Sequence, residues 1–254
     1  MKTLGILGGM GVQATSAFYA MLTRLQSVTH EQDYMDVIIY SKPSIPDRTA
    51  FITGQSDNSP LASLVAAAKV LENAGAGLIA MPCVTAHFFY DELIKTVEVP
   101  FVNMLDETAS HLHKSGYTTI GLLATKGTLD GQMFHRAFDK RGIKVITPPQ
   151  AGQASLSRLI YRLKRGELPE GKGFRTSDGC GQKSKESDIA SKCGSNFNLL
   201  DSLSFDLHSQ GAQAIVLGCT ELGLLKQNSQ NSKYMYIEAM EVLAKAVLER
   251  HDNK

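Results

Sequence analysis

The sequence contains no tryptophan, no long apolar run and almost no net charge. No hydrophobic stretch approaches the roughly 20 residues that a membrane-spanning helix needs, so that class of protein is excluded. The formal charge of +1 comes from 26 basic and 25 acidic residues that are interspersed along the chain. Electrostatics therefore give no reason to expect binding to nucleic acid or to a membrane surface.

Cysteine is also scarce, with four residues in a chain of 254. Four are too few for a disulfide framework in a chain of this size. The segment 1–9 has a brief apolar core interrupted by glycines, which is typical of a first strand and its loop rather than of a signal peptide. We therefore expect a cytoplasmic protein whose thiols are free for chemistry.

Strand-like and helix-like segments alternate along most of the chain, which predicts an α/β fold with parallel sheets. We expect two pseudo-symmetric Rossmann-like domains, each a mostly parallel sheet flanked by helices. Residues 1–100 together with about 226–254 are predicted to form the N-terminal domain, which carries Cys83. Residues 101–225 are predicted to form the second domain, which carries Cys219. The active site is expected in the cleft between the two domains.

The individual elements follow from runs of apolar residues and from helical spacing. The expected strands are 4–7, 37–40, 77–81, 119–123, 143–146, 214–217 and 234–237. The expected helices are 15–28, 61–73, about 86–96, 105–114, 131–140, 155–164, 197–208 and 238–250.

Residues 166–195 break this alternation. The stretch is rich in glycine, serine and lysine and has few large apolar residues, so we expect a long exposed loop. It contains Cys180 and Cys193, whose spacing fits no common zinc-binding pattern. We interpret these two as solvated loop thiols, and a local disulfide or redox switch is the alternative.

Two short segments place a cysteine just after a strand-like apolar run. Cys83 follows residues 77–81, and Cys219 follows residues 214–217. Both are expected at turns beyond the carboxyl ends of strands, where open α/β sheets bind ligands. A single buried cysteine is usually an inert core residue. Two cysteines in one local setting instead suggest a reaction with two similar steps, such as moving a proton off one face of a carbon and onto the other.

The residues after each cysteine are candidates for adjusting its reactivity. Thr85 and Thr220 offer a hydroxyl and a backbone N–H beside the two sulfurs. His87 and Glu221 follow within one turn, where they are suited either to tune the thiols or simply to cap the helices. A helix amino terminus favours the thiolate, and we expect that effect at both turns.

The opening loop contains Gly9-Met-Gly-Val-Gln-Ala14, which has the form of a dinucleotide-binding fingerprint. That fingerprint also needs an acidic residue at the end of the second strand, and no carboxylate follows residues 37–40 until Asp47. A turn that holds a carboxylate through its N–H groups, or that merely lets the helix pack, explains the same residues. A nucleotide-dependent oxidoreductase, which NAD would protect, remains an alternative.

Arg48 lies in the segment 44–49, which prolines stiffen. A guanidinium held in a rigid loop is suited to grip a carboxylate with two hydrogen bonds. A surface charge is the alternative interpretation.

These motifs together resemble the aspartate/glutamate racemase family, the cofactor-independent amino-acid racemases, and its aspartate racemases in particular. The resemblance spans the whole chain apart from residues 166–195. Its markers are Gly-Gly-Met-Gly at 8–11, Pro-Asp-Arg-Thr at 46–49, Pro-Cys-Val-Thr-Ala-His at 82–87, Leu-Leu-Ala-Thr at 122–125 and Gly-Cys-Thr-Glu at 218–221.

The resemblance implies a two-base mechanism in which Cys83 and Cys219 face opposite sides of the Cα of a small acidic amino acid, aspartate or glutamate. No pyridoxal, metal or nucleotide is then needed, and a homodimer is expected. The resemblance also implies a set of substrate-binding residues. The pocket for the α-carboxylate and amino group would contain Gly9, Met10, Thr85, Thr125 and Thr220, and the side-chain carboxylate would be held by Arg48 and Lys164.

The chain departs from the family pattern at Val84, where the family has an asparagine that contacts the substrate. Valine cannot form hydrogen bonds, and loss of one such donor can cost on the order of a hundredfold in rate. A non-catalytic amino-acid-binding protein is therefore an alternative, and so is a related isomerase or decarboxylase such as maleate isomerase, which needs only one nucleophilic cysteine. If the valine is a handicap, Val84→Asn should raise racemase activity.

Overall fold

The computed structural model describes residues 2–167, 189–226 and 233–252. In these ranges, eight strands form two parallel sheets of four. The first sheet has the order β2-β1-β3-β4 and consists of β1 (Leu4–Gly8), β2 (Val37–Ser41), β3 (Leu78–Ala80) and β4 (Phe101–Val102). The second has the order β6-β5-β7-β8 and consists of β5 (Thr119–Ala124), β6 (Lys144–Ile146), β7 (Ala214–Gly218) and β8 (Tyr236–Glu238).

The two sheets have equivalent strand orders, which confirms the predicted fold class of two Rossmann-like halves. Under this equivalence β3, which leads to Cys83, corresponds to β7, which leads to Cys219. Every residue of β1 and of β7 is buried. Parallel strands covered on both faces have such continuous apolar sequences, because neither face meets water.

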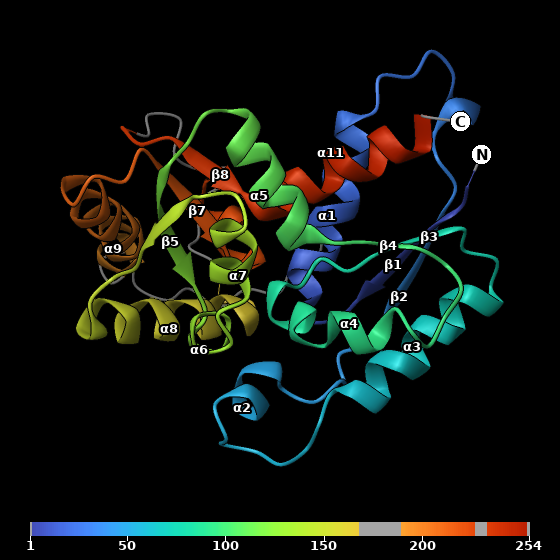
Figure 1. The fold of residues 1–254 in the computed structure, drawn as a ribbon, viewed down its shortest axis with the longest axis horizontal. Helices are drawn as coiled ribbons and strands as arrows, with labels where there is room; N and C mark the ends of the chain where they lie inside the picture. Colours follow the sequence, from blue (N-terminus) through green and yellow to red (C-terminus); the bar gives the residue numbers. More distant parts are fainter. Residues whose placement is uncertain (1, 168–188, 227–232, 253–254) are drawn as a thin grey trace.

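Helices cover both sheets (Figure 1). They are α1 (Val12–Leu25), α2 (Arg48–Ile52), α3 (Leu61–Asn73), α4 (Tyr90–Leu93), α5 (Met104–Lys114), α6 (Lys126–Asp130), α7 (Met133–Asp139), α8 (Gln150–Lys164), α9 (Ile189–Ser209), α10 (Thr220–Lys226) and α11 (Ala239–Asp252), with 3-10 turns η1 (Glu31–Asp33) and η2 (Val84–Phe89). Helix α11 packs against α1 and α5 in the centre of the molecule, between the two sheets. Helix α3 packs on the first sheet, and α8 and α9 pack on the second.

A single apolar cluster joins the two halves. It contains Leu4 and Ile6 of β1 together with Ile120 of β5 and Val216 of β7, and the central helices fill the space between them. Two smaller clusters lie under α3 and under α8 and α9. Since burial of apolar surface is the main stabilising contribution to a fold, this shared core holds the two halves together as one body. In the described part of the chain, no helix is both long and apolar enough to cross a membrane.

Strand pairing departs from the expected domain boundaries at two places. Residues 101–102 form β4 and pair with β3 of the first sheet, although they were assigned to the second domain. Residues 236–238 form β8 and pair with β7 of the second sheet, although they were assigned to the first domain. Both strands are short edge strands that continue a buried apolar surface, and local sequence does not reveal which neighbour such a strand will join.

Two expected elements also differ from the structure. The helix predicted for 86–96 is a 3-10 turn followed by the short α4, and α9 begins at Ile189, so the end of the predicted loop 166–195 is helical. Cys193 therefore belongs to α9, whereas residues 168–188, with Cys180, lie outside the described residues. The strong bias to glycine, serine and lysine concealed the start of this helix.

The loop after β1 is possible only with glycine at position 9. Gly9 has a φ of +92°, and a Cβ there would collide with the backbone of Lys42. We predict that Gly9→Ala lowers the free energy of unfolding by about 2 kcal/mol or more beyond the loss from Gly54→Ala. Gly54 is the matched control, because its φ is +71° but no atom lies within 4 Å of the added Cβ. Urea denaturation measures both variants, and equal losses would contradict the close approach.

Candidate active site

The carboxyl ends of the two sheets meet at one centre. Thr85, which follows β3, lies with its Oγ1 3.3 Å from the Oγ1 of Thr125, which follows β5. The loop after β1 reaches the turn after β7, where Gly11 lies against the carboxylate of Glu221. One contact thus joins the ends of β3 and β5 and the other the ends of β1 and β7, so the two sheets face each other with their carboxyl ends, where open parallel sheets bind ligands.

The side chain of Glu221, two residues further along the chain, forms a hydrogen bond with Cys219. Its Sγ donates a hydrogen bond to Oε2 of Glu221 at 3.0 Å, and the Thr220 hydroxyl donates to the same oxygen at 3.2 Å. The exposed fractions are 4% for Cys219 and 1% for Glu221. Glu221 thus holds the proton on Cys219 in a position where water does not compete.

The Cys219 thiol is harder to ionise than the sequence predicted. Burial raises its pKa well above the usual range, the charge of Glu221 raises it further, and Lys164 opposes both effects. The expectation that the turn would favour the thiolate is therefore wrong for Cys219, because a neighbouring anion and the loss of solvent outweigh the helix terminus.

Cys83 is positioned through its backbone. The residue is 4% exposed, and its carbonyl accepts a hydrogen bond from Nδ1 of His87 at 2.9 Å. Nε2 of the same ring accepts the N–H of Met104 at 3.2 Å, at the start of α5. Both ring nitrogens are thus used on the backbone, so His87 fixes the turn that carries Cys83 rather than contacting its sulfur.

Lys164 lies within electrostatic range of both thiols. It is the last residue of α8, and its ammonium lies 5.8 Å from the ring centroid of Tyr161. Burial disfavours its charged form, but Glu221 and the sulfurs of Cys219 and Cys83 outweigh this effect, so the pKa of Lys164 is raised. Because both sulfurs act on this one ammonium, the two cysteines border the same site.

Arg48 lies at the start of α2, where Asp47 caps the helix by accepting the N–H of Ala50. Its Nη1 donates to the carbonyls of Ile45 and Pro46, and its Nη2 donates to the carbonyl of Met10 at 3.5 Å. Three of the five N–H groups of the guanidinium are therefore used. Its Nε is buried and has no partner in the described structure. Arg48 is buried and fixed rather than a surface charge.

A chain of hydroxyl groups extends from the first half into the second. Beyond the contact between Thr85 and Thr125, the Oγ1 of Thr125 lies 2.9 Å from that of Thr128, whose N–H also donates to it. All three threonines are buried. Sequence analysis missed Thr128, although the pattern Thr-x-x-Thr at the start of a helix is a signal for such a cap.

The N–H of Gly9 and the carbonyl of Met10 are already used within the protein. The N–H of Gly9 donates to Oγ1 of Thr15 at 2.9 Å, and the carbonyl of Met10 accepts from Arg48. The side chain of Met10 belongs to the apolar cluster under α3. Gly9 and Met10 therefore support Arg48 and the loop, and the N–H of Gly9 is not free to receive a carboxylate.

Val84 is 3% exposed and belongs to the shared apolar cluster. Its side chain packs with core residues, so this departure from the family pattern is compensated by burial rather than left as an open gap.

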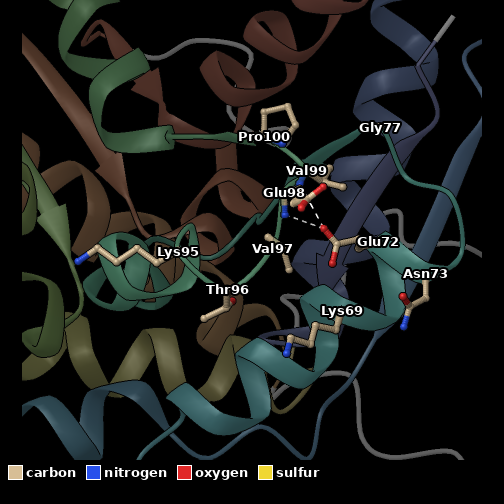
Figure 2. Close-up of a pocket in the computed structure, with 10 residues that line it drawn as sticks. All are labelled: Lys69, Glu72, Asn73, Gly77, Lys95, Thr96, Val97, Glu98, Val99 and Pro100. Atoms are coloured by element: carbon tan, nitrogen blue, oxygen red, sulfur yellow. Dashed lines mark hydrogen bonds between the residues drawn. The ribbon is translucent and has the colours of Figure 1, made fainter.

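A cavity of about 890 Å³ lies elsewhere, at the amino end of β3 (Figure 2). In it the carboxylate of Glu72 accepts the N–H groups of Glu98 and Val99, at 2.7 and 3.3 Å, and Figure 2 shows it turned toward that loop. None of its lining residues is a cysteine or a histidine. Despite its volume, this cavity is therefore not the candidate active site.

Among the described residues, no group of three or more His, Cys, Asp or Glu side chains is arranged to hold a metal ion.

Burial of His87 makes stability depend on pH. Burial lowers its pKa from 6.5 to about 4, against the opposing effect of the hydrogen bond to Cys83. The folded protein therefore binds fewer protons than the unfolded chain between these values, so this contribution is present above pH 6.5 and is lost as the pH falls toward 4. We predict a loss of about 3 kcal/mol over this range, measured by urea unfolding. His87→Gln should show a smaller slope, and an equal slope would contradict the assignment.

Comparison with known proteins places this site in a family. A family model described as Asp/Glu/Hydantoin racemase matches residues 7–178. The broad specificity amino-acid racemase RacX of Bacillus subtilis (strain 168) is 29% identical over 168 residues, which are 64% of this chain and 71% of that protein. The structure is similar to Picrophilus torridus aspartate racemase, with a TM-score of 0.78, 26% identity and coverage of 98% of this chain and 94% of that one.

It is also similar to an aspartate racemase homologue from Pyrococcus horikoshii OT3, with a TM-score of 0.71, 25% identity and coverage of 98% and 99% of the two chains. The family model spans more than half of the chain, and the solved structures match almost all of it. The chain therefore belongs to the Asp/Glu/Hydantoin racemase family.

Proposed function

We propose that this protein is a cofactor-independent racemase of a small acidic amino acid, with aspartate the first candidate and glutamate the second. The observation that carries this proposal is the pair of buried thiols, Cys83 and Cys219, which both lie within electrostatic range of the Lys164 ammonium. Two thiols and a cation in a water-poor site can remove and return a proton next to a carboxylate.

The proposed reaction begins with Cys219 as the acid. Its proton is already held by Glu221, which supports this assignment. The Cys83 thiolate takes the Cα proton and becomes a thiol, while the C–H electron pair remains on the substrate as a carbanion. Cys219 then gives its proton to the opposite face of the carbon and becomes the thiolate. The reverse reaction exchanges these roles, and no proton or electron is gained or lost overall.

The carbanion needs hydrogen-bond donors, because the Cα proton of an amino acid is very weakly acidic. Three buried hydroxyl groups, those of Thr85, Thr125 and Thr128, form a connected chain at the strand ends. We propose that this chain, together with Thr220, faces the α-carboxylate, where preorganised donors stabilise negative charge as it develops. Arg48 and Lys164 are proposed to hold the side-chain carboxylate, since two of the five N–H groups of the guanidinium remain for such a grip.

The relatives support the substrate class in different ways. The similar solved structure from Picrophilus torridus is an aspartate racemase, whereas RacX is a broad specificity amino-acid racemase. Arg48 and Lys164 favour an acidic side chain over a neutral one, because Arg48 is buried without a carboxylate partner and Glu221 is a single anion beside two cations. A cytoplasmic location, a homodimer and a division of the chain into two domains, each built on one of the two sheets, are parts of the same proposal.

The decisive test is loss of the Cα proton in deuterated buffer under reducing conditions, followed by proton NMR. We predict exchange with both enantiomers of aspartate, and at least a hundredfold loss in both Cys83→Ala and Cys219→Ala. Cys193→Ala is the matched control, because it removes a thiol that does not follow β3 or β7, and it should keep full activity.

Other outcomes of this test would point to other functions. Ligand-induced thermal stabilisation without proton exchange would identify a non-catalytic amino-acid-binding protein. Dependence on only one of the two cysteines, with turnover of a dicarboxylate that lacks an amino group, would identify an isomerase of the maleate type.

Replacement of Val84 tests the departure from the family pattern. The side chain is buried in the shared core, so we predict that Val84→Asn lowers the free energy of unfolding by about 1–3 kcal/mol and does not raise the exchange rate. Val84→Ala is the control for lost volume without an added amide. A faster exchange in Val84→Asn would show instead that the valine is a catalytic handicap.

A further inference from the structure

One carboxylate oxygen in the site has no partner. Oε2 of Glu221 accepts hydrogen bonds from Cys219 and Thr220, whereas Oε1 is buried and accepts none from the described residues. Leaving a buried acceptor unsatisfied costs about 1–3 kcal/mol, and more for a charged group. Such an orphaned atom in a ligand site suggests that the ligand itself supplies the donor.

The loop after β1 makes room for this oxygen. A Cβ at Gly11 would lie 2.5 Å from Oε1 of Glu221 and 3.9 Å from Cγ of Lys164. The absence of a side chain at Gly11 therefore lets the carboxylate and the lysine stem share one side of the site. The same anion fills the space beside the glycine loop, which argues against a dinucleotide pyrophosphate there.

The charges around this oxygen form a definite pattern. Arg48 supplies a buried cation, Lys164 a half-buried one, and Glu221 a buried anion. Aspartate carries two carboxylates and one ammonium, which is the complementary set. A dicarboxylate without an amino group would match the two cations but leave Glu221 unmatched.

We propose that Oε1 of Glu221 accepts the α-ammonium of the substrate and makes Glu221 the residue that selects amino acids over plain dicarboxylates. This inference rests on the proposed function, since it assumes an acidic amino acid between Cys83 and Cys219. The ammonium nitrogen is bonded to Cα, and the other oxygen of the same carboxylate binds Sγ of Cys219. One side chain thereby places the reacting carbon beside the sulfur that protonates it.

Isothermal titration calorimetry with racemic aspartate and with succinate tests this role. Racemic aspartate is used so that turnover causes no net reaction, and succinate is aspartate without its amino group. We expect the wild type to bind aspartate more tightly than succinate. In Glu221→Gln, the affinity for aspartate should fall at least tenfold, while the affinity for succinate stays the same or rises. The exposed Glu249→Gln is the matched control and should leave both affinities unchanged.

The outcomes separate this inference from the proposed function. If Glu221 were only a counter-ion for Lys164, its neutralisation would raise the affinity for aspartate and for succinate alike, and that result would overturn the inference. An equal loss of affinity for both ligands would overturn it too. If the wild type bound neither aspartate nor succinate, the proposed function itself would fail, and this inference with it.

Gly11→Ala provides a second variant that keeps the charge. Its methyl group would displace Oε1 of Glu221, so we expect the same selective loss of aspartate binding, again at least tenfold. This variant decides the question if Glu221→Gln does not fold. Unchanged preference for aspartate in Gly11→Ala would contradict the role of Oε1.

Discussion

A buried carboxylate is costly unless its neighbours compensate for lost water, and Glu221 is 1% exposed. Its compensation comes from the S–H of Cys219, the O–H of Thr220 and the charge of Lys164. Each of these groups lies where it does because α10, which follows β7, packs against α8, and because Gly11 has no side chain. The position of the carboxylate therefore fixes the thiol, the cation and the glycine loop at once, and the proposed chemistry depends on all three.

The two halves are equivalent in backbone but not in chemistry. Cys83 and Cys219 follow corresponding strands, yet His87 binds the carbonyl of the first and Glu221 binds the sulfur of the second. In the proposed reaction, which exchanges the roles of the two thiols, this difference would make Cys219 the acid of the resting protein. The repeated fold supplies two corresponding positions for the thiols, and in the proposed reaction the local side chains decide which thiol starts with the proton.

Sequence reasoning predicted what depends on local pattern. Alternating apolar runs predicted the strands and the fold class, and the two Cys-containing turns were expected at strand ends, where the structure has them. It did not predict the sheet to which β8 belongs, because a three-residue edge strand carries no information about its partner. It also did not predict that Glu221 raises the pKa of Cys219 or that the N–H of Gly9 is used by Thr15. Those depend on distances that only the folded chain sets.

The central claim is that Glu221 keeps Cys219 protonated and so makes the two thiols unequal. The most direct measurement is the pH dependence of the Cβ chemical shift of Cys219 in protein labelled with carbon-13 at cysteine, assigned with Cys219→Ala. We predict that Cys219 remains a thiol beyond the ordinary range of about 8.5, and that Glu221→Gln lowers its midpoint. Titration of Cys219 at the ordinary value in the wild type, unchanged in Glu221→Gln, would contradict the account.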